Sequence, residues 1–180
     1  FYFGVPNCIS FRLICRHKLT DVRQNPPMTD STVESVAFVG LGAMGGPMCA
    51  KLTAKSPVPV LAHDLDSDAV RRAVEAGAIA ATGLENIANA DIVFVCVPGE
   101  EETRAVCLAE NGLCQNAREG QVVVDCTTAT VRVNLEVAEA LKARGANFAD
   151  APVVRGVPNA LGRTLSITVG GDKEVFDRIA

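Results

Sequence analysis

Three glycines with the spacing G-x-G-x-x-G, Gly40, Gly42 and Gly45, stand between a short apolar run and a helix-compatible stretch. In such a loop the first glycine permits a tight turn, the second lets the backbone approach a phosphate, and the third allows the helix to pack closely on the strand. The helix N-terminus then offers free N–H groups and the positive end of its dipole to an anion. The pattern predicts a pyrophosphate-binding loop formed by Gly40, Leu41, Gly42, Ala43, Met44 and Gly45.

Asp64 closes the next apolar run, 24 residues after Gly40. A carboxylate at this distance is typical of a residue that accepts hydrogen bonds from the adenosine ribose hydroxyls of NAD. The 2′-phosphate of NADP would meet a like charge there, which costs on the order of 4 kcal/mol at 4 Å and an effective dielectric of 20. No arginine follows to neutralise it, so we expect NAD to bind and NADP to be disfavoured. The alternative is a capping or solvated turn residue, although Asp66 and Ser67 are better placed to cap the following helix.

The elements that must position these residues alternate along the chain. Short β-rich runs cover residues 35–40, 58–64, 91–97, 121–126, 146–153 and 164–171. Helix-compatible stretches cover residues 43–55, 67–77, 101–110, 131–145 and 172–180. This order predicts an α/β fold of the Rossmann type, a doubly wound and mainly parallel sheet with right-handed crossovers.

Composition narrows the function classes. The 180 residues suit one domain, 48% are hydrophobic, and no apolar run is long enough to cross a bilayer. Seven cysteines without a C-x-x-C spacing and only two histidines predict reduced thiols and no metal site. Apart from its first residues the chain is acidic, so neither nucleic acid nor membrane is an expected partner. We expect a cytoplasmic protein, with a mitochondrial one as the alternative.

Residues 1–28 look foreign to this fold. They begin with Phe, lack periodicity and end at a Pro26-Pro27 breaker just before Met28. We expect a disordered or non-native extension, and a transit peptide is the alternative because the stretch is poor in acids. The cofactor-binding domain is expected to span residues 34–180.

The segment GLGAMGGPMCAKL, residues 40–52, resembles the cofactor signature of the β-hydroxyacid dehydrogenases, which include 3-hydroxyisobutyrate, tartronate semialdehyde and L-threonate dehydrogenases. The resemblance continues through VCVP at 95–98, DCTT at 125–128 and DAPVVRGVPNALGRTLSITVGG at 150–171. It implies that Val97 and Pro98 line the nicotinamide-ribose side. It also implies that Glu102 makes a peripheral cofactor contact and that Thr128 hydrogen-bonds near the nicotinamide.

The substrate loop departs from the family pattern. Where the family has Ser-Gly-Gly, this chain has Val154, Arg155 and Gly156. In the family, that serine and the loop amides are thought to hold the substrate carboxylate. We hypothesise that the guanidinium of Arg155 replaces them, because its planar fork matches a carboxylate; the alternative is a solvated loop arginine.

The resemblance also implies a catalytic lysine and a helical C-terminal domain that closes the site and forms the dimer, both expected beyond residue 180. No lysine of this chain matches that motif, so no catalytic residue is assigned here, and we expect the chain alone to bind cofactor without activity.

The expected full-length protein is a homo-oligomer that interconverts a small β-hydroxyacid and its semialdehyde or ketoacid by hydride transfer. The substrate class is that of 3-hydroxyisobutyrate, 2-hydroxy-3-oxopropionate and threonate. The alternatives are a non-catalytic cofactor-binding scaffold and a relative of 6-phosphogluconate dehydrogenase. A redox role for Cys126 is not favoured, because the spacing implies no partner thiol.

Overall fold

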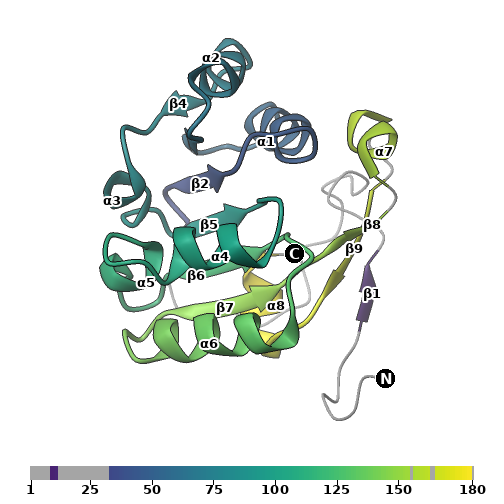
Figure 1. Ribbon diagram of the computed structural model, residues 1–180. Helices are drawn as coiled ribbons and strands as arrows, with labels where there is room; N and C mark the ends of the chain where they lie inside the picture. The colour runs from purple at the N-terminus through teal and green to yellow at the C-terminus, as the bar shows by residue number, and fades with distance from the viewer. Residues whose placement is uncertain (1–8, 12–32, 155, 163–164, 180) are drawn as a thin grey trace.

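The central element is a six-stranded parallel sheet with the order β4-β3-β2-β5-β6-β7. The computed structural model describes residues 9–11, 33–154, 156–162 and 165–179 (Figure 1). The strands are β2 (Val36–Val39), β3 (Val60–His63), β4 (Ile79–Ala80), β5 (Ile92–Val95), β6 (Val122–Asp125) and β7 (Asn147–Asp150). The strand order reverses between β2 and β5, which confirms the doubly wound Rossmann-type sheet.

Helices cover both faces of this sheet (Figure 1). One face packs against α1 (Gly45–Thr53), α2 (Ser67–Glu75) and α8 (Lys173–Ile179). The other packs against α3 (Leu84–Ile87), α4 (Glu100–Cys107), α5 (Leu113–Asn116) and α6 (Val131–Lys142). Because successive side chains of a strand point to opposite faces, each buried strand contributes side chains to the hydrophobic cores on both faces of the sheet.

The centre of the sheet shows this alternation. Phe38 of β2 and Phe94 of β5 lie in register and point toward α1, with their rings stacked and their centroids 5.9 Å apart. Val39 and Val95, one residue further along, point toward α4 and α6. The two strands that flank the switch point are thus fixed on both faces by apolar packing.

A small antiparallel sheet, with the order β1-β9-β8, lies beside the parallel one. It contains β1 (Ile9–Phe11), β8 (Val153–Val154) and β9 (Ser166–Val169), with α7 (Gly156–Gly162) between the last two strands in sequence. The expectation of one strand over residues 146–153 is wrong. The ladder of the parallel sheet ends where Ala151 donates to the carbonyl of Asp125, because Pro152 has no N–H to continue it.

Residues 9–11 pair with β9, so this part of the N-terminal extension forms a strand. The rest of residues 1–28 lies outside the described residues, and the proposed disorder of that segment stays a prediction. In the part of the chain that the structure describes, no helix combines the length and apolarity needed to span a membrane.

Leu141 and Leu135 of α6 form a matched pair for testing the core. Leu141 is fully buried against the sheet, whereas Leu135 is 59% exposed on the outer face of the same helix. Leu141→Ala is expected to lower the free energy of unfolding by about 2–5 kcal/mol, because it removes buried methyl groups and leaves a cavity. Leu135→Ala is expected to change it by less than about 0.5 kcal/mol. Urea unfolding curves check both values, and equal losses would contradict this assignment of the buried face.

Candidate cofactor site

The glycine loop begins with a turn that only glycine fits. Gly40 has a φ of +88°, and a Cβ atom there would lie 2.2 Å from the carbonyl oxygen of Cys96. Its N–H donates to the carbonyl of His63 at 3.0 Å, so the loop leaves β2 while still joined to β3. The loop therefore lies at the carboxyl ends of β3, β2 and β5, where open α/β sheets bind ligands.

The other two glycines of the motif have different surroundings. A Cβ on Gly45 would lie 1.9 Å from the carbonyl oxygen of Gly40 and 3.2 Å from the ring of Phe38, so this residue lets α1 approach the strand. A Cβ on Gly42 would meet nothing within 4 Å, and Gly42 and Ala43 are both exposed. The space beside Gly42 is thus open on the side where the sequence predicts the pyrophosphate.

No side chain caps the N-terminus of α1 beside this space, although the N–H of Gly46 donates to the carbonyl of Gly42 at 2.9 Å. The capping residue of α1, Met44, has no side chain that accepts from the first-turn N–H groups, and the first turn contains no acid. By contrast, the first turn of α4 contains three glutamates, Glu100, Glu101 and Glu102. An anion is therefore better accommodated at α1, where the dipole is uncompensated, than at α4. The residues present fit a bound dinucleotide phosphate.

Asp64 joins the glycine loop to the end of β3. Its Oδ2 accepts from the N–H of Leu41 at 2.6 Å, and its Oδ1 accepts from the N–H of Asp66 at 2.8 Å. Capping of α2 falls instead to Asp66, which accepts from the N–H of Asp68 at 2.9 Å. Each carboxylate oxygen of Asp64 has a second lone pair, so ribose hydroxyls could still donate to it.

The loops that follow β5 and β6 are joined by one hydroxyl group. Thr127 is buried, its Oγ1 accepts from the N–H of Val97 at 3.1 Å, and its own N–H donates to Oδ1 of Asp125 at 2.8 Å. The neighbouring Pro98 and Thr128 are exposed. Buried Thr127 thus fixes the two loops that carry the predicted nicotinamide contacts.

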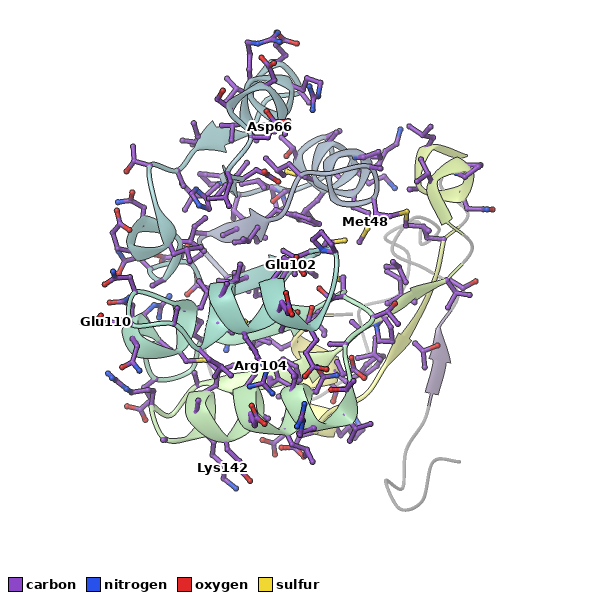
Figure 2. The ribbon with its side chains drawn as sticks, in the orientation of Figure 1. Met48, Asp66, Glu102, Arg104, Glu110 and Lys142 are labelled. Atoms are coloured by element: carbon purple, nitrogen blue, oxygen red, sulfur yellow. The ribbon has the colours of Figure 1, made fainter. Side chains whose placement is uncertain are left out.

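Glu102 is exposed in the first turn of α4, close to Gly99 (Figure 2). The neighbouring Glu100 joins α4 to α6, because it accepts from the hydroxyl of Thr130 at 2.8 Å and from Arg132 at 3.0 Å. These bonds lower the pKa of the Glu100 carboxyl. Arg104 adds an ion pair with Glu136 of α6. The helices that follow the two loops are therefore linked to each other at the same edge of the sheet.

Two carboxylates that the motif analysis did not assign lie at the ends of β6 and β7. Asp125 and Asp150 are partners in the parallel register, and Asp125 is fully buried. Burial raises the pKa of Asp125, while burial and the charge of Asp125 raise the pKa of Asp150 to about 6. An acid that ends each of two apolar strand runs is the signal that could have revealed them.

The structure also supplies the neighbour that the spacing of Cys126 did not imply. Cys96 and Cys126 directly follow Val95 and Asp125, which are register partners, and both thiols belong to the apolar core beside α1. Burial raises the pKa of Cys96 to about 11 and that of Cys126 further, so both are poor nucleophiles. The cysteines among the described residues are free thiols. No group of three or more metal-ligating His, Cys, Asp or Glu side chains occurs there.

The predicted substrate loop follows β8. Val154 is half-exposed at the end of this strand, and Gly156 has a φ of +65° where α7 begins. Arg155 lies outside the described residues. The glycine loop, Asp64, Val97, Pro98, Glu102 and Thr128 are positioned by the parallel sheet and its helices, whereas this loop is attached to the small antiparallel sheet.

The segment that forms this edge of the sheet matches a known protein family. Residues 35–180 match the family model of the NAD-binding domain of 6-phosphogluconate dehydrogenase. The chain belongs to this family. It contains an NAD- or NADP-binding domain, and it spans about half the length of the curated relatives it matches.

Three relatives illustrate the match. The 3-hydroxyisobutyrate dehydrogenase of Pseudomonas aeruginosa is 38% identical over 144 residues, which are 79% of this chain and 48% of that protein. The solved Mycobacterium tuberculosis 3-hydroxyisobutyrate dehydrogenase with L-serine has a TM-score of 0.74 and 31% identity, covering 82% of this chain and 50% of that one. Psf3 in complex with NADP+ and 2-OPP has a TM-score of 0.75 and 32% identity, covering 80% and 51%. These matches confirm the resemblance to the β-hydroxyacid dehydrogenases.

Gly42→Ala is expected to weaken NAD binding without a loss of stability, whereas Gly45→Ala is expected to lower the stability of the fold. The added methyl group of Gly42→Ala enters open space, so the melting temperature should hold while NAD affinity falls by about tenfold, equivalent to about 1.4 kcal/mol. Gly45→Ala forces the methyl group against the Gly40 carbonyl and should cost about 1–3 kcal/mol of stability. Thermal unfolding and calorimetric titration with NAD measure the two effects. Unchanged NAD affinity in Gly42→Ala would contradict the phosphate assignment.

Proposed function

We propose that this domain binds NAD in preference to NADP and belongs to an enzyme that oxidises or forms a small β-hydroxyacid by hydride transfer. The observation that carries the proposal is the Asp64 carboxylate, held beside the glycine loop by the N–H of Leu41. The adjacent loop offers a helix N-terminus without a side-chain cap or a first-turn acid, and open space for a pyrophosphate. Asp64 would then receive the ribose hydroxyls on one side of those phosphates.

The charge around Asp64 supports NAD over NADP. The next residues are Leu65, which is 98% exposed, and Asp66, which is also exposed. The two arginines of α2 are already paired, because Arg72 lies 3.8 Å from Asp66 and Arg71 pairs with Asp68 and Glu75. A 2′-phosphate beside Asp64 would therefore meet a like charge, and both guanidinium groups of α2 are engaged by other carboxylates.

Asp64→Asn tests this preference without removing the loop contact, because the amide oxygen can still accept from Leu41. Loss of the charge is expected to narrow the ratio of NADP to NAD dissociation constants by about tenfold or more. Glu110→Gln, which removes a charge from an exposed residue between α4 and α5, is the control, and it should leave the ratio within about twofold. Calorimetric titration of each variant with both cofactors gives the ratios. An unchanged ratio in Asp64→Asn would contradict the NAD assignment.

In the matched relatives, the region similar to this chain forms about half of the protein. We therefore assign the activity to the full-length protein and not to this domain alone. In that protein NAD would accept or deliver the hydride, and this chain would position it. Val97 and Pro98 would line the nicotinamide-ribose side, Thr128 would hydrogen-bond near the ring, and Glu102 would contact the cofactor at its periphery. The named dehydrogenase relatives support a hydroxyacid substrate. Assay of the full-length protein with NAD and a panel of β-hydroxyacids, followed by NADH absorbance, tests the activity; no turnover of any of them would contradict it.

The substrate loop of Val154, Arg155 and Gly156 is proposed to hold the substrate carboxylate. Gly156 contributes a positive-φ turn with open space beside it, and Arg155 would supply the bidentate guanidinium.

In the full-length enzyme, Arg155→Ala is expected to raise the Michaelis constant for the hydroxyacid by about tenfold or more, because a charge-assisted bond contributes about 1.5–3 kcal/mol. Arg155→Lys should recover part of the loss, since it keeps the charge without the planar fork. Steady-state kinetics with saturating NAD measure both variants. A Michaelis constant that stays unchanged in Arg155→Ala would leave this arginine without a role in binding.

A further inference from the structure

A buried carboxyl group, Asp125, and a half-buried one, Asp150, lie next to each other at the edge of the sheet that carries the predicted nicotinamide contacts. Asp125 ends β6 and Asp150 ends β7, and the two residues are directly paired in the parallel register. Their side chains share the face of the sheet that packs on α6, because Val123 and Phe148, two residues earlier on each strand, belong to that core. Both groups are therefore held at the carboxyl edge of the parallel sheet.

Only one of the two side-chain oxygens of Asp125 has a hydrogen-bond partner among the described residues. One of its oxygens accepts from Thr127, but Oδ2 is buried and has no hydrogen-bond partner among the described residues. Asn134 of α6 faces Asp150, and the Oδ1 of Asn134 is likewise buried without a partner there. A buried carboxylate oxygen without a donor costs free energy unless the group carries a proton.

The groups packed around the pair supply no positive charge. Asp125 faces the thiols of Cys96 at the end of β5, Cys107 on α4 and Cys126 on its own strand. Burial raises the pKa of all three thiols, so they are neutral at pH 7. Asp150 faces Asp125, Cys126, the uncharged Asn134 and the backbone of Gly170. Among the described residues no lysine or arginine contributes to either carboxyl, and two adjacent carboxylates without a cation do not both ionise readily.

A short chain of hydrogen bonds connects this pair to the cofactor loops. The N–H of Thr127 donates to Oδ1 of Asp125 at 2.8 Å, and the Oγ1 of Thr127 accepts from the N–H of Val97 at 3.1 Å. A change in the charge of Asp125 and Asp150 therefore changes the electrostatic environment of the two loops that carry Val97, Pro98 and Thr128.

We propose that Asp125 and Asp150 share one proton in the cofactor-free protein, and that binding of oxidised rather than reduced nicotinamide favours release of that proton. The inference rests on the proposed cofactor function. Oxidised nicotinamide carries a positive charge that the reduced ring lacks, so a doubly ionised pair stabilises NAD+ selectively. By linkage, the affinity for NAD+ relative to NADH rises with pH as the pair titrates, and the two carboxyls act as positioning residues through Thr127.

The cofactor-free protein tests the shared proton first. Carboxyl-carbon NMR of aspartate-labelled protein is expected to show one carboxyl titrating near pH 6. That titration should be absent in Asp150→Asn, and in Asp125→Asn the remaining group should move toward its ordinary value of about 4. A wild-type spectrum in which no carboxyl titrates above about pH 5 would overturn the proposal.

The titration of Asp150 also predicts how the stability of the fold changes with pH. The pKa of Asp150 is raised in the folded state, so its protonation stabilises the fold, and this contribution is complete below about pH 4. It is lost as the pH rises through about 6, and the melting temperature should fall over that range. Asp150→Asn, which imitates the neutral acid, should fold and lack this fall; an unchanged pH profile in the variant would count against the pair.

Cofactor binding tests the coupling. Between pH 5 and pH 8 the ratio of the NAD+ to the NADH dissociation constant is expected to fall by about fivefold in the wild type and to stay flat in Asp150→Asn. Glu110→Gln, a change at an exposed residue between α4 and α5, is the control and should keep the wild-type slope. A flat wild-type ratio, or a slope that survives in Asp150→Asn, overturns the coupling. Failure of both cofactors to bind would defeat the proposed function and the coupling together, whereas the NMR titration judges the shared proton independently.

Discussion

Close contact between backbone segments at the switch point of the sheet governs this structure. Gly40 turns so near to the carbonyl of Cys96, and Gly45 so near to the carbonyl of Gly40, that neither position has room for a side chain. These two contacts join β2, β5 and α1 at one corner. Because α1 starts there, its N-terminus lies at the carboxyl edge of the sheet, and the positions of Asp64, Val97 and Thr127 follow from the strands on either side.

Charge is distributed unevenly along that edge. At α1 no acid compensates the helix dipole, whereas at α4 three glutamates occupy the first turn and Glu100 is paired with Arg132. Beyond them, Asp125 and Asp150 bring carboxyl groups into an apolar interior. One half of the edge therefore suits the negative phosphates of a dinucleotide, and the other half suits a ring that gains and loses positive charge.

The sequence predicted the parts of the fold that repeat over many residues. Each buried strand of the parallel sheet and each long helix was predicted from periodicity, and the glycine loop from its motif. The helices α3 and α5 and the strand β4 were missed, because four or two residues are too few to show a period. The break at Ala151 and Pro152 was missed because β7 and β8 read as one apolar run, although the proline marks where the ladder ends.

In the candidate site, too, the sequence indicates residues that are related by a short spacing in the chain, but not those that only the folded sheet brings together. Asp64 was identified because its distance from Gly40 is fixed by one strand and one helix. The neighbours Asp125 and Asp150, and Cys96 and Cys126, are 25 and 30 residues apart in the chain, and only the register of the sheet brings each pair together. The loop contact of Thr127 depends on a hydroxyl that no spacing rule distinguishes from that of Thr128.

The departure of the chain from the parallel sheet after Ala151 divides the two predicted binding loops between two sheets. The predicted dinucleotide contacts follow strands and helices of the parallel sheet, whereas Val154 and Gly156 follow the small antiparallel sheet, and the isolated bridge between Asp150 and Gly170 links the two. Side chains of the second loop can therefore be exchanged without a change in the backbone contacts that fix the glycine loop. In such an architecture the choice of acid and the grip on the nucleotide are separate engineering problems.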